Sequence, residues 1–178
     1  LNIVLDPGLA FGTGAHPTTQ LCLRWLRGMV DARSSLLDYG CGSGILAIAA
    51  AKLGAHRVVG TDIDAQAVRA SIANARANRV DAAFAGVDEL SSERFDIVVA
   101  NILANPLRLL APALAARTVR GGSIALSGIL AMQADDVVDA YAPWFDMRVR
   151  ERDDDWVLVH VGFALSRRRS RLRVRRTG

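Results

Sequence analysis

Three glycines at alternate positions, Gly40, Gly42 and Gly44, constrain the fold more than any other feature of the sequence. The apolar stretch before them ends at Asp38 and predicts a buried strand, and the alanine-rich stretch after them predicts a helix. Glycines between a strand and a helix let the backbone approach a ligand closely, and the free N–H groups of the helix N-terminus then face that ligand. The pattern therefore predicts a ligand-binding βαβ unit.

A second apolar stretch, residues 58–62, follows the expected helix and ends in Asp62. An acid about twenty residues after a glycine turn can accept hydrogen bonds from both hydroxyls of a ribose, which predicts a nucleoside-containing ligand. Dinucleotide-binding turns read G-x-G-x-x-G, and Ile45 stands where the third glycine of that pattern would fall, which argues against NAD or FAD. A turn that serves only helix–strand packing is the structural alternative, and the placement of Asp62 argues against it.

The string Leu-Asp-x-Gly-x-Gly-x-Gly over residues 37–44 resembles the first motif of class I methyltransferases that depend on S-adenosylmethionine (SAM). The resemblance implies an α/β, Rossmann-like fold: a seven-stranded, mostly parallel sheet with the last strand antiparallel and helices on both faces. It also implies that SAM is the cofactor, that Gly40 and Gly42 pass beside its methionine part, and that Asp62 holds its ribose. Asp64 is interpreted as the N-cap of the next helix.

The hydrophobic pattern predicts further helices and strands that fit this fold. Helices are expected over residues 18–29, 45–53, 65–77, 107–118 and 131–141. Besides the strand that ends at Asp38, strands are expected over residues 58–62, 82–85, 95–100, 123–127, 145–151 and 156–163. Residues 1–5 are expected to form a short strand or an extended lead-in. Gly54 is expected to end a helix, and the acidic run 153–155 to form a hairpin turn.

A second string, residues 5–19, is more specific than the glycine turn. It reads Leu-Asp-Pro-Gly-Leu-Ala-Phe-Gly-Thr-Gly-Ala-His-Pro-Thr-Thr and resembles, with almost no deviation, a segment of the methyltransferases that modify ribosomal protein L11, the PrmA family. By this resemblance Phe11 lines the SAM pocket and Thr19 hydrogen-bonds the cofactor. His16 is interpreted as a residue that caps or packs locally, and Thr18 and Thr19 could equally cap the helix that follows.

The strand expected over residues 95–100 is followed by Asn101-Ile102-Leu103-Ala104. Class I enzymes that methylate nitrogen place an Asn or Asp there to accept hydrogen bonds from the amine. Many of them continue with two prolines, which are absent here, whereas Asn-Ile-Leu-Ala matches the PrmA family. The resemblance implies that Asn101 binds SAM and orients the amine; an Asn that satisfies a turn is the structural alternative. Asn105 is interpreted as a turn or helix cap, and Asp88 as a solvated turn residue rather than an adenine contact.

The basic balance of the chain comes from its C-terminal end. The formal net charge is +4, and seven arginines with no acid among them lie between Arg167 and Arg176. Removing those seven positive charges leaves −3 for the rest of the chain. We therefore expect one methyltransferase domain over residues 1–164 and an arginine-rich, disordered tail over residues 165–178. The tail could contact ribosomal RNA weakly through phosphates, and a solvated end is the simpler interpretation.

The two cysteines, Cys22 and Cys41, lie in an amphipathic helix pattern and in the glycine turn, and neither is expected to form a disulfide. They have no nearby histidine pair, so no metal site is expected. The apolar runs are too short for a transmembrane span, and no signal-peptide pattern is present. These features predict a cytoplasmic protein with no membrane partner.

The resemblance to the PrmA family covers roughly residues 5–163 and implies methylation of lysine and N-terminal amines of ribosomal protein L11. No convincing general base is apparent. The family's members also carry a smaller N-terminal domain that grips the ribosomal protein, and this chain, which begins at Leu1, contains none. We therefore expect either a catalytic fragment or a stand-alone relative that methylates another amine-bearing protein.

Two other functions stay open at this point. The first is a methyltransferase of the same fold that acts on RNA, DNA or a small amine; the missing Asn-Pro-Pro argues against it, and the arginine-rich end argues weakly for it. The second is a non-catalytic SAM-binding module. The joint presence of Gly40, Asp62 and Asn101 argues against lost activity.

Overall fold

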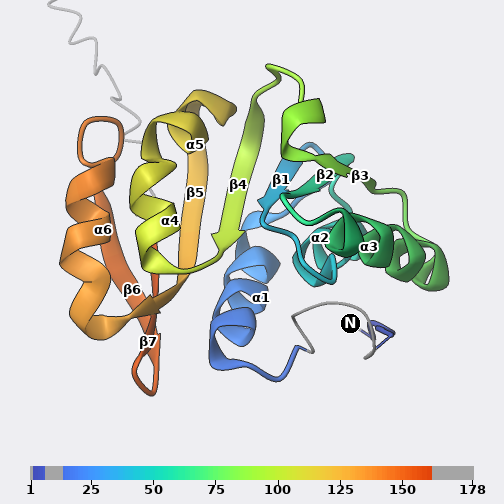
Figure 1. The fold of residues 1–178 in the computed structure, drawn as a ribbon, viewed down its shortest axis with the longest axis horizontal. Coiled ribbons are helices and arrows are strands. Elements are labelled where there is room, and N and C mark those ends of the chain that lie inside the picture. The colour runs from blue at the N-terminus through green and yellow to red at the C-terminus, as the bar shows by residue number, and fades with distance from the viewer. Residues whose placement is uncertain (1, 7–13, 162–178) are drawn as a thin grey trace, which may run out of the picture.

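The computed structural model describes residues 2–6 and 14–161. Their strands form one seven-stranded sheet in the order β3-β2-β1-β4-β5-β7-β6 (Figure 1). The strands are β1 Ser35–Tyr39, β2 Arg57–Asp62, β3 Ala83–Gly86, β4 Phe95–Asn101, β5 Thr118–Leu130, β6 Met147–Asp153 and β7 Trp156–Val161. Neighbouring strands from β3 to β5 are parallel, and β7 runs antiparallel to both β5 and β6. The α/β class, the mostly parallel sheet and the antiparallel last strand are thus confirmed.

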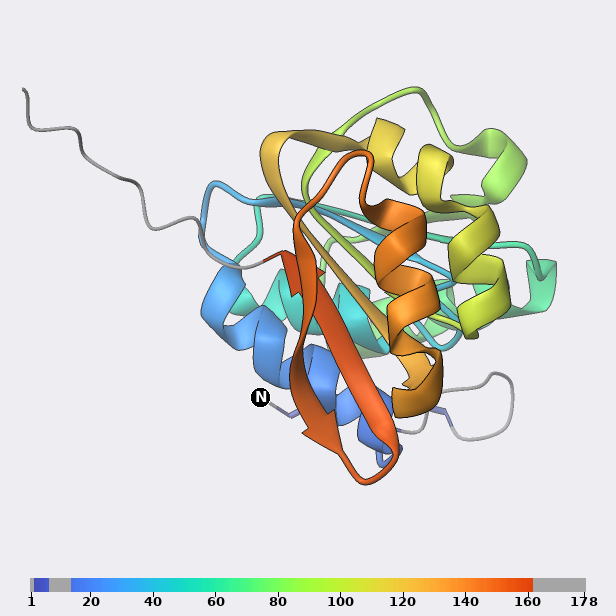
Figure 2. The ribbon, with the colours of Figure 1, turned by 90° about the vertical axis from the view of Figure 1, so that its left-hand side faces the viewer.

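Helices cover both faces of this sheet (Figure 2). One face carries α1 Pro17–Met29, α2 Ile45–Leu53 and α3 Ala65–Asn78, and the other carries α4 Ala104–Leu109, α5 Ala111–Arg117 and α6 Ala134–Tyr141. Two short 3-10 helices complete the described elements, η1 Val87–Glu89 and η2 Ala131–Gln133. None of the helices in these residues is long and apolar enough to cross a lipid bilayer.

The alternation of side chains along each strand divides the apolar residues into two cores. In β1, Leu36 packs beneath α1 and α2, whereas Leu37 packs beneath α4, α5 and α6, and both are fully buried. A sheet buried on both faces needs apolar side chains at consecutive positions, which explains the continuous apolar runs of β1 and β4. The carboxyl ends of the parallel strands meet at one edge, where polar residues replace the apolar ones.

Two predicted elements have different limits. The helix expected over residues 107–118 is wrong: α4 ends at Leu109 and α5 begins at Ala111. Pro112 lacks an N–H and its ring would clash with the carbonyl four residues earlier, so one continuous helix cannot form there. The strand expected from residue 123 begins instead at Thr118, and an irregularity in its pairing with β4 accommodates the extra residues.

Other corrections concern ends of elements. Asn105 lies inside the first turn of α4 and does not cap it, because Leu103 occupies the N-cap position. Residues 2–6 of the lead-in form no helix and join no strand of the sheet. Asp153 belongs to β6, so Asp154 and Asp155 alone make the hairpin turn.

Residues 131–133 form η2 before α6 begins at residue 134. Strand β6 starts only at residue 147, because the N–H groups of residues 144 and 145 bond back to the end of α6.

The predicted caps are partly confirmed. Asp64 Oδ1 accepts a hydrogen bond from Gln66 N at 2.8 Å and caps α3, as expected. Gly54 ends α2 in a left-handed conformation, also as expected. For α1 the cap is His16, whose Nδ1 accepts from Thr18 N at 3.3 Å, so neither threonine serves as the cap.

Candidate functional site

The predicted site residues that the structure describes meet at the carboxyl edge of β1, β2 and β4. After β1 the chain builds β2 and β3 on one side, and it then returns to build β4 and β5 on the other. In open parallel sheets, ligands bind in the crevice at such a reversal of strand order. The glycine turn follows β1, Asp62 ends β2 and Asn101 ends β4.

The glycine turn is held by the end of β2. The backbone N–H groups of Gly40 and Cys41 donate to Thr61 O at 2.8 and 3.0 Å, and Gly42 N donates to Asp62 Oδ2 at 2.9 Å. The other carboxylate oxygen of Asp62 accepts from Asp64 N at 3.0 Å. Each carboxylate oxygen can accept more than one hydrogen bond, so Asp62 is held in place and can still accept from two hydroxyls.

Asp38 is buried where β1 enters the turn, with 1% of its surface exposed. Its Oδ2 accepts from Ala47 N at 3.0 Å and so caps α2, whose N-cap residue, Gly44, has no side chain to do so. Its Oδ1 has no hydrogen-bond partner among the described residues. Burial raises the pKa of Asp38 to about 7; the charge of Asp62 acts in the same direction, and the bond from Ala47 opposes it. An unpaired buried oxygen is costly, and a cation bound beside it would reduce that cost.

Asn101 and Thr19 are brought together from distant parts of the sequence. Asn101 Nδ2 donates to Thr19 Oγ1 at 3.4 Å, so the end of β4 contacts the first turn of α1. Thr19 is 2% exposed. The ring of His16 packs edge-on against Trp156 with centroids 5.1 Å apart, which confirms local packing for this histidine. Phe11, the remaining predicted site residue, lies outside the described residues.

Ile102, directly after Asn101, packs between two glycines, with its side chain against Gly40 and its backbone against Gly128. A Cβ on Gly40 would lie 2.4 Å from Ile102 Cγ2, and a Cβ on Gly128 would lie 2.3 Å from Ile102 O. Both glycines also have positive φ angles, 76° and 81°, which side chains disfavour. Sequence analysis did not assign Gly128 to the site. Gly128 lies within β5, but it follows directly after the strand expected over residues 123–127, and that position was the available signal.

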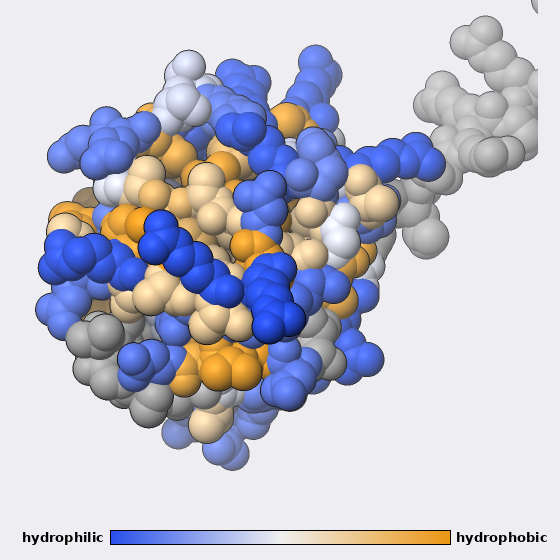
Figure 3. Space-filling view, turned by 90° about the vertical axis from the view of Figure 1, so that its right-hand side faces the viewer, coloured by the Kyte–Doolittle hydropathy of each residue, from blue (hydrophilic) through white to orange (hydrophobic). Residues whose placement is uncertain are grey.

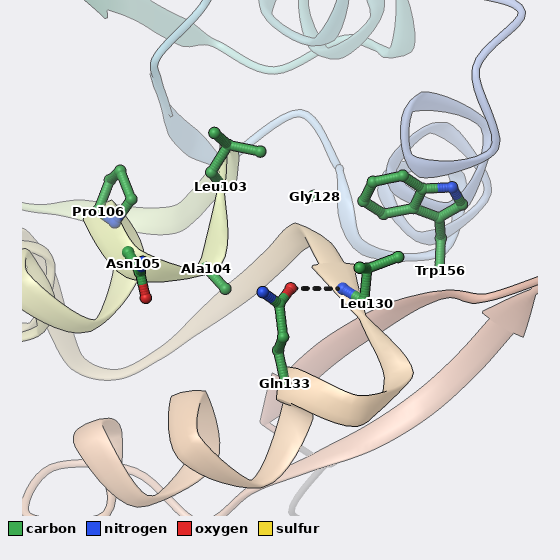
Figure 4. Close-up of a pocket in the computed structure, with 8 residues that line it drawn as sticks. All are labelled: Leu103, Ala104, Asn105, Pro106, Gly128, Leu130, Gln133 and Trp156. Carbon is green, nitrogen blue, oxygen red and sulfur yellow. Dashed lines mark hydrogen bonds between the residues drawn. The ribbon is translucent and has the colours of Figure 1, made fainter.

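A cavity of about 370 Å³ opens beside the loop that follows Asn101 (Figure 4). It is lined by Leu103, Ala104, Asn105, Pro106, Gly128, Leu130, Gln133 and Trp156. Gln133 Oε1 accepts from Leu130 N at 3.1 Å, and its amide nitrogen faces the cavity. Leu103 is 68% exposed and forms an apolar rim. Sequence analysis did not identify Gln133 or Trp156, because nothing in their local sequence marks them as site residues.

The described residues contain no group of three potential metal ligands. Both cysteines are free and buried, in agreement with the prediction. Burial raises the pKa of both thiols, Cys22 and Cys41, well above the usual range, so neither has the thiolate character of a nucleophile. Asp88 lies in η1 on the exposed surface, as its interpretation as a solvated turn residue requires. The groups that the described residues bring to the site are carboxylates, an amide, a hydroxyl and backbone N–H groups.

Several solved structures share this fold. The ribosomal protein L11 methylase of Lactobacillus delbrueckii subsp. bulgaricus superposes with a TM-score of 0.81 at 36% identity, covering 90% of this chain and 84% of that chain. A T. thermophilus 16S rRNA methyltransferase (RsmC), solved with AdoMet and guanosine, superposes with a TM-score of 0.70. Its identity is 22%, over 85% of this chain and 44% of that chain, and it shows the fold alone.

Sequence relatives are closer. The ribosomal protein L11 methyltransferase of Thiobacillus denitrificans is 62% identical over 157 residues, which are 88% of this chain and 53% of the relative. The ribosomal protein L11 methyltransferase of Neisseria gonorrhoeae is 58% identical over 156 residues, which are 88% of this chain and 53% of the relative. The chain thus spans about half the length of the curated relatives it matches. The family model "Ribosomal protein L11 methyltransferase (PrmA)" matches residues 1–163. This chain therefore belongs to the ribosomal protein L11 methyltransferase (PrmA) family.

Proposed function

We propose that this chain is the catalytic part of a SAM-dependent N-methyltransferase whose substrate is ribosomal protein L11. The observation that carries the proposal is the meeting of Gly42, Asp62, Thr19 and Asn101 at one edge of the sheet. These residues come from four different elements, and the relatives that share the sequence are named for L11 methylation.

The residues at this edge fit SAM by their chemistry. Asp62 would accept from the ribose hydroxyls, and the turn with Gly40 and Gly42, at the N-terminus of α2, would bind the methionine carboxylate. SAM carries positive charge on its ammonium group and its sulfur, which suits the unpaired Oδ1 of Asp38. When bound, SAM supplies an activated methyl group on that sulfur. Thr19, and Phe11 by its family resemblance, complete the proposed cofactor contacts.

The cavity beside the loop that follows Asn101 fits an amine that ends an aliphatic chain. Leu103, Leu130 and Trp156 offer apolar surface for a lysine side chain. A lysine amine has a reference pKa of about 10.4, and an apolar environment lowers it and favours the neutral form with a free lone pair. Asn101 would accept hydrogen bonds from this amine and orient it. Positioning of this kind can lower a barrier by roughly 7–11 kcal/mol, so a dedicated base is not required.

Calorimetry of SAM binding tests the proposal, with Asp62→Ala beside the wild type. Losing hydrogen bonds to a carboxylate should raise the Kd about 10- to 150-fold. Asp64→Ala is the matched control, because it removes the neighbouring carboxylate that caps α3 and should leave the Kd within about twofold. Wild-type protein that binds no SAM, or equal effects of both variants, would contradict the cofactor site.

Transfer of labelled methyl groups then tests the substrate. The reaction should label purified L11 and not ribosomal RNA. Label in the RNA instead would favour the alternative enzyme that acts on nucleic acid, and binding without transfer to any amine would favour a non-catalytic module.

Three further expectations belong to the same proposal. The folded domain extends over residues 1–164, followed by the tail 165–178, which lies outside the described residues. The arginines between Arg167 and Arg176 contact ribosomal RNA weakly through phosphates, so that binding should weaken as salt rises. The protein acts in the cytoplasm, where thiols such as Cys22 and Cys41 stay reduced.

A further inference from the structure

Helix α3 buries two asparagines on the side that faces the protein. Asn74 and Asn78 are one helical turn apart and are 3% and 9% exposed, whereas Arg69 and Arg76 of the same helix are exposed to solvent. Figure 3 shows the side of the molecule where α3 and β3 lie, with hydrophilic side chains interspersed among apolar ones. Buried amides need partners, because an unpaired one would cost roughly 1–3 kcal/mol. The hydrogen-bond partners of Asn74 and Asn78 differ, and the difference suggests a positioning role for one of them.

Among the described residues, Asn78 makes hydrogen bonds to the lead-in segment and to its own helix. Its Oδ1 accepts from Val4 N at 3.0 Å, and its Nδ2 donates to Val4 O at 2.6 Å and to Asn74 O at 2.8 Å. The two bonds to the backbone of Val4 hold the lead-in against α3.

Asn74 connects two segments of the site. Its Oδ1 accepts from Asp6 N at 3.0 Å, and its Nδ2 donates to Ser43 O at 2.9 Å. Asp6 is the last described residue before the segment that contains Phe11, and Ser43 belongs to the glycine turn. The amide provides an acceptor and a donor on two separate atoms, whereas an ionised carboxylate only accepts, so an aspartate at this position could keep the first bond but not the second.

We propose that Asn74 is a positioning residue that couples the lead-in to the glycine turn, so that the two are held in register for cofactor binding. The proposal rests on the function proposed above and adds a residue that does not itself touch the cofactor. Asn74 acts through Ser43 O, next to the Gly42 N–H that bonds Asp62, and through Asp6 N. A shift of either segment is thereby transmitted to the other through one buried side chain.

Asn78 provides a matched control. Asn74→Asp and Asn78→Asp each lose the bonds that an amide nitrogen donates and each bury a carboxylate one turn apart on the same helix. Both should lower the stability by similar amounts. Only Asn74→Asp removes a bond to the glycine turn.

Two readouts separate positioning from stability. Calorimetry should show SAM binding about tenfold weaker in Asn74→Asp and within twofold of wild type in Asn78→Asp. Amide hydrogen exchange, measured without cofactor, should be faster over residues 40–46 in Asn74→Asp and unchanged there in Asn78→Asp. If either acidic variant does not fold, Asn74→Leu and Asn78→Leu replace the pair and carry the same expectations.

The proposal is overturned if the Asn74 and Asn78 variants change the affinity and the exchange of residues 40–46 equally, or if neither variant changes them. Wild-type protein that binds no SAM contradicts the proposed function instead. The exchange comparison in the cofactor-free protein still decides whether Asn74 couples the two segments.

Discussion

Strands β1 and β4 lie side by side, and their two ends hold carboxylates in opposite ways. At the amino end, Asp96 Oδ2 accepts from Ser35 Oγ at 2.6 Å and from Ser35 N at 2.9 Å, and Asp96 N donates to Ser35 Oγ at 3.0 Å. These bonds, chiefly the one from the hydroxyl, hold the pKa of Asp96 below its usual range. At the carboxyl end, Asp38 keeps an oxygen without a partner among the described residues, and burial raises its pKa to about 7.

The comparison distinguishes the Ser35–Asp96 contact, which stabilises the fold, from the buried carboxyl of Asp38, which lowers the stability of the fold. The Ser35–Asp96 pair ties the starts of two strands together and leaves the carboxylate charged at neutral pH. Asp38 caps α2 but remains only partly satisfied, in the place where a cationic cofactor is proposed to bind. Polar groups that the folded chain leaves unsatisfied in its interior are expected at functional sites, where a ligand completes them.

The largest expected effect is the pH dependence of stability caused by Asp38. Folded protein keeps this carboxyl protonated up to about pH 7, whereas the unfolded chain loses the proton near pH 4, so stability should fall as pH rises between them. Relative to Asp38→Asn, the wild type should lose up to about 4 kcal/mol across that range. Urea unfolding at a series of pH values measures this difference. Parallel profiles for the two proteins would contradict it.

Asp96→Asn extends the same experiment, because the contribution of Asp96 to stability changes with pH in the opposite direction to that of Asp38. The pKa of Asp96 is lowered on folding, so its stabilising contribution is present above about pH 4 and disappears as pH falls through the folded pKa. The variant should therefore differ most from wild type at neutral pH and least in acid.

Next in size is the effect of Asn101 on catalysis. Asn101→Ala removes the amide that contacts Thr19 and is proposed to orient the amine. The rate of methyl transfer to L11 should fall about 100-fold, since small misplacements of a reacting group have effects of that order. Asn101→Asp keeps an acceptor oxygen and should retain more activity than the alanine variant. Equal activity of wild type and Asn101→Ala would remove Asn101 from the mechanism.

Ser35→Ala removes the contact with Asp96 at the amino ends of β1 and β4. The change removes both hydrogen bonds of the hydroxyl with Asp96 and should lower the free energy of unfolding by about 2 kcal/mol. Because Ser35 lies at the opposite end of β1 from the glycine turn, SAM affinity should stay within about twofold. A large loss of affinity would show that the two ends are not independent.

The smallest expected effect belongs to the cap of α3. Asp64→Ala removes the bond from Gln66 N and should cost about 1 kcal/mol of stability, as is typical of N-cap removal. Thermal unfolding measures the loss. A change in SAM affinity as large as that of Asp62→Ala would assign Asp64 to the site instead of the helix.

Local patterns allowed much of the fold to be predicted, and also the proximity of some candidate site residues. The turn of Gly40 and Gly42 and the acid at Asp62 lie within one βαβ unit, so their spacing in sequence already determines their proximity in space. The sequence pattern predicted the local structure wrongly where residues distant in the sequence pack against the segment. Asn105 was predicted to cap a helix, but Leu103 occupies the N-cap position of α4, and Ile102 before it lies close to Gly40 and Gly128, which are distant in the sequence.

The sequence by itself determined the parallel α/β class, the glycine turn, the cap at Asp64 and the family, because these depend on short-range spacing and on strings of neighbouring residues. Only the tertiary structure decided which side chains share a contact across β1, β4 and α3. The unpaired oxygen of Asp38 and the bridge that Asn74 makes from Asp6 to Ser43 are of this kind. Burial and hydrogen bonding depend on what packs against a residue, and those partners stand 31 and 68 positions from Asn74 in the chain.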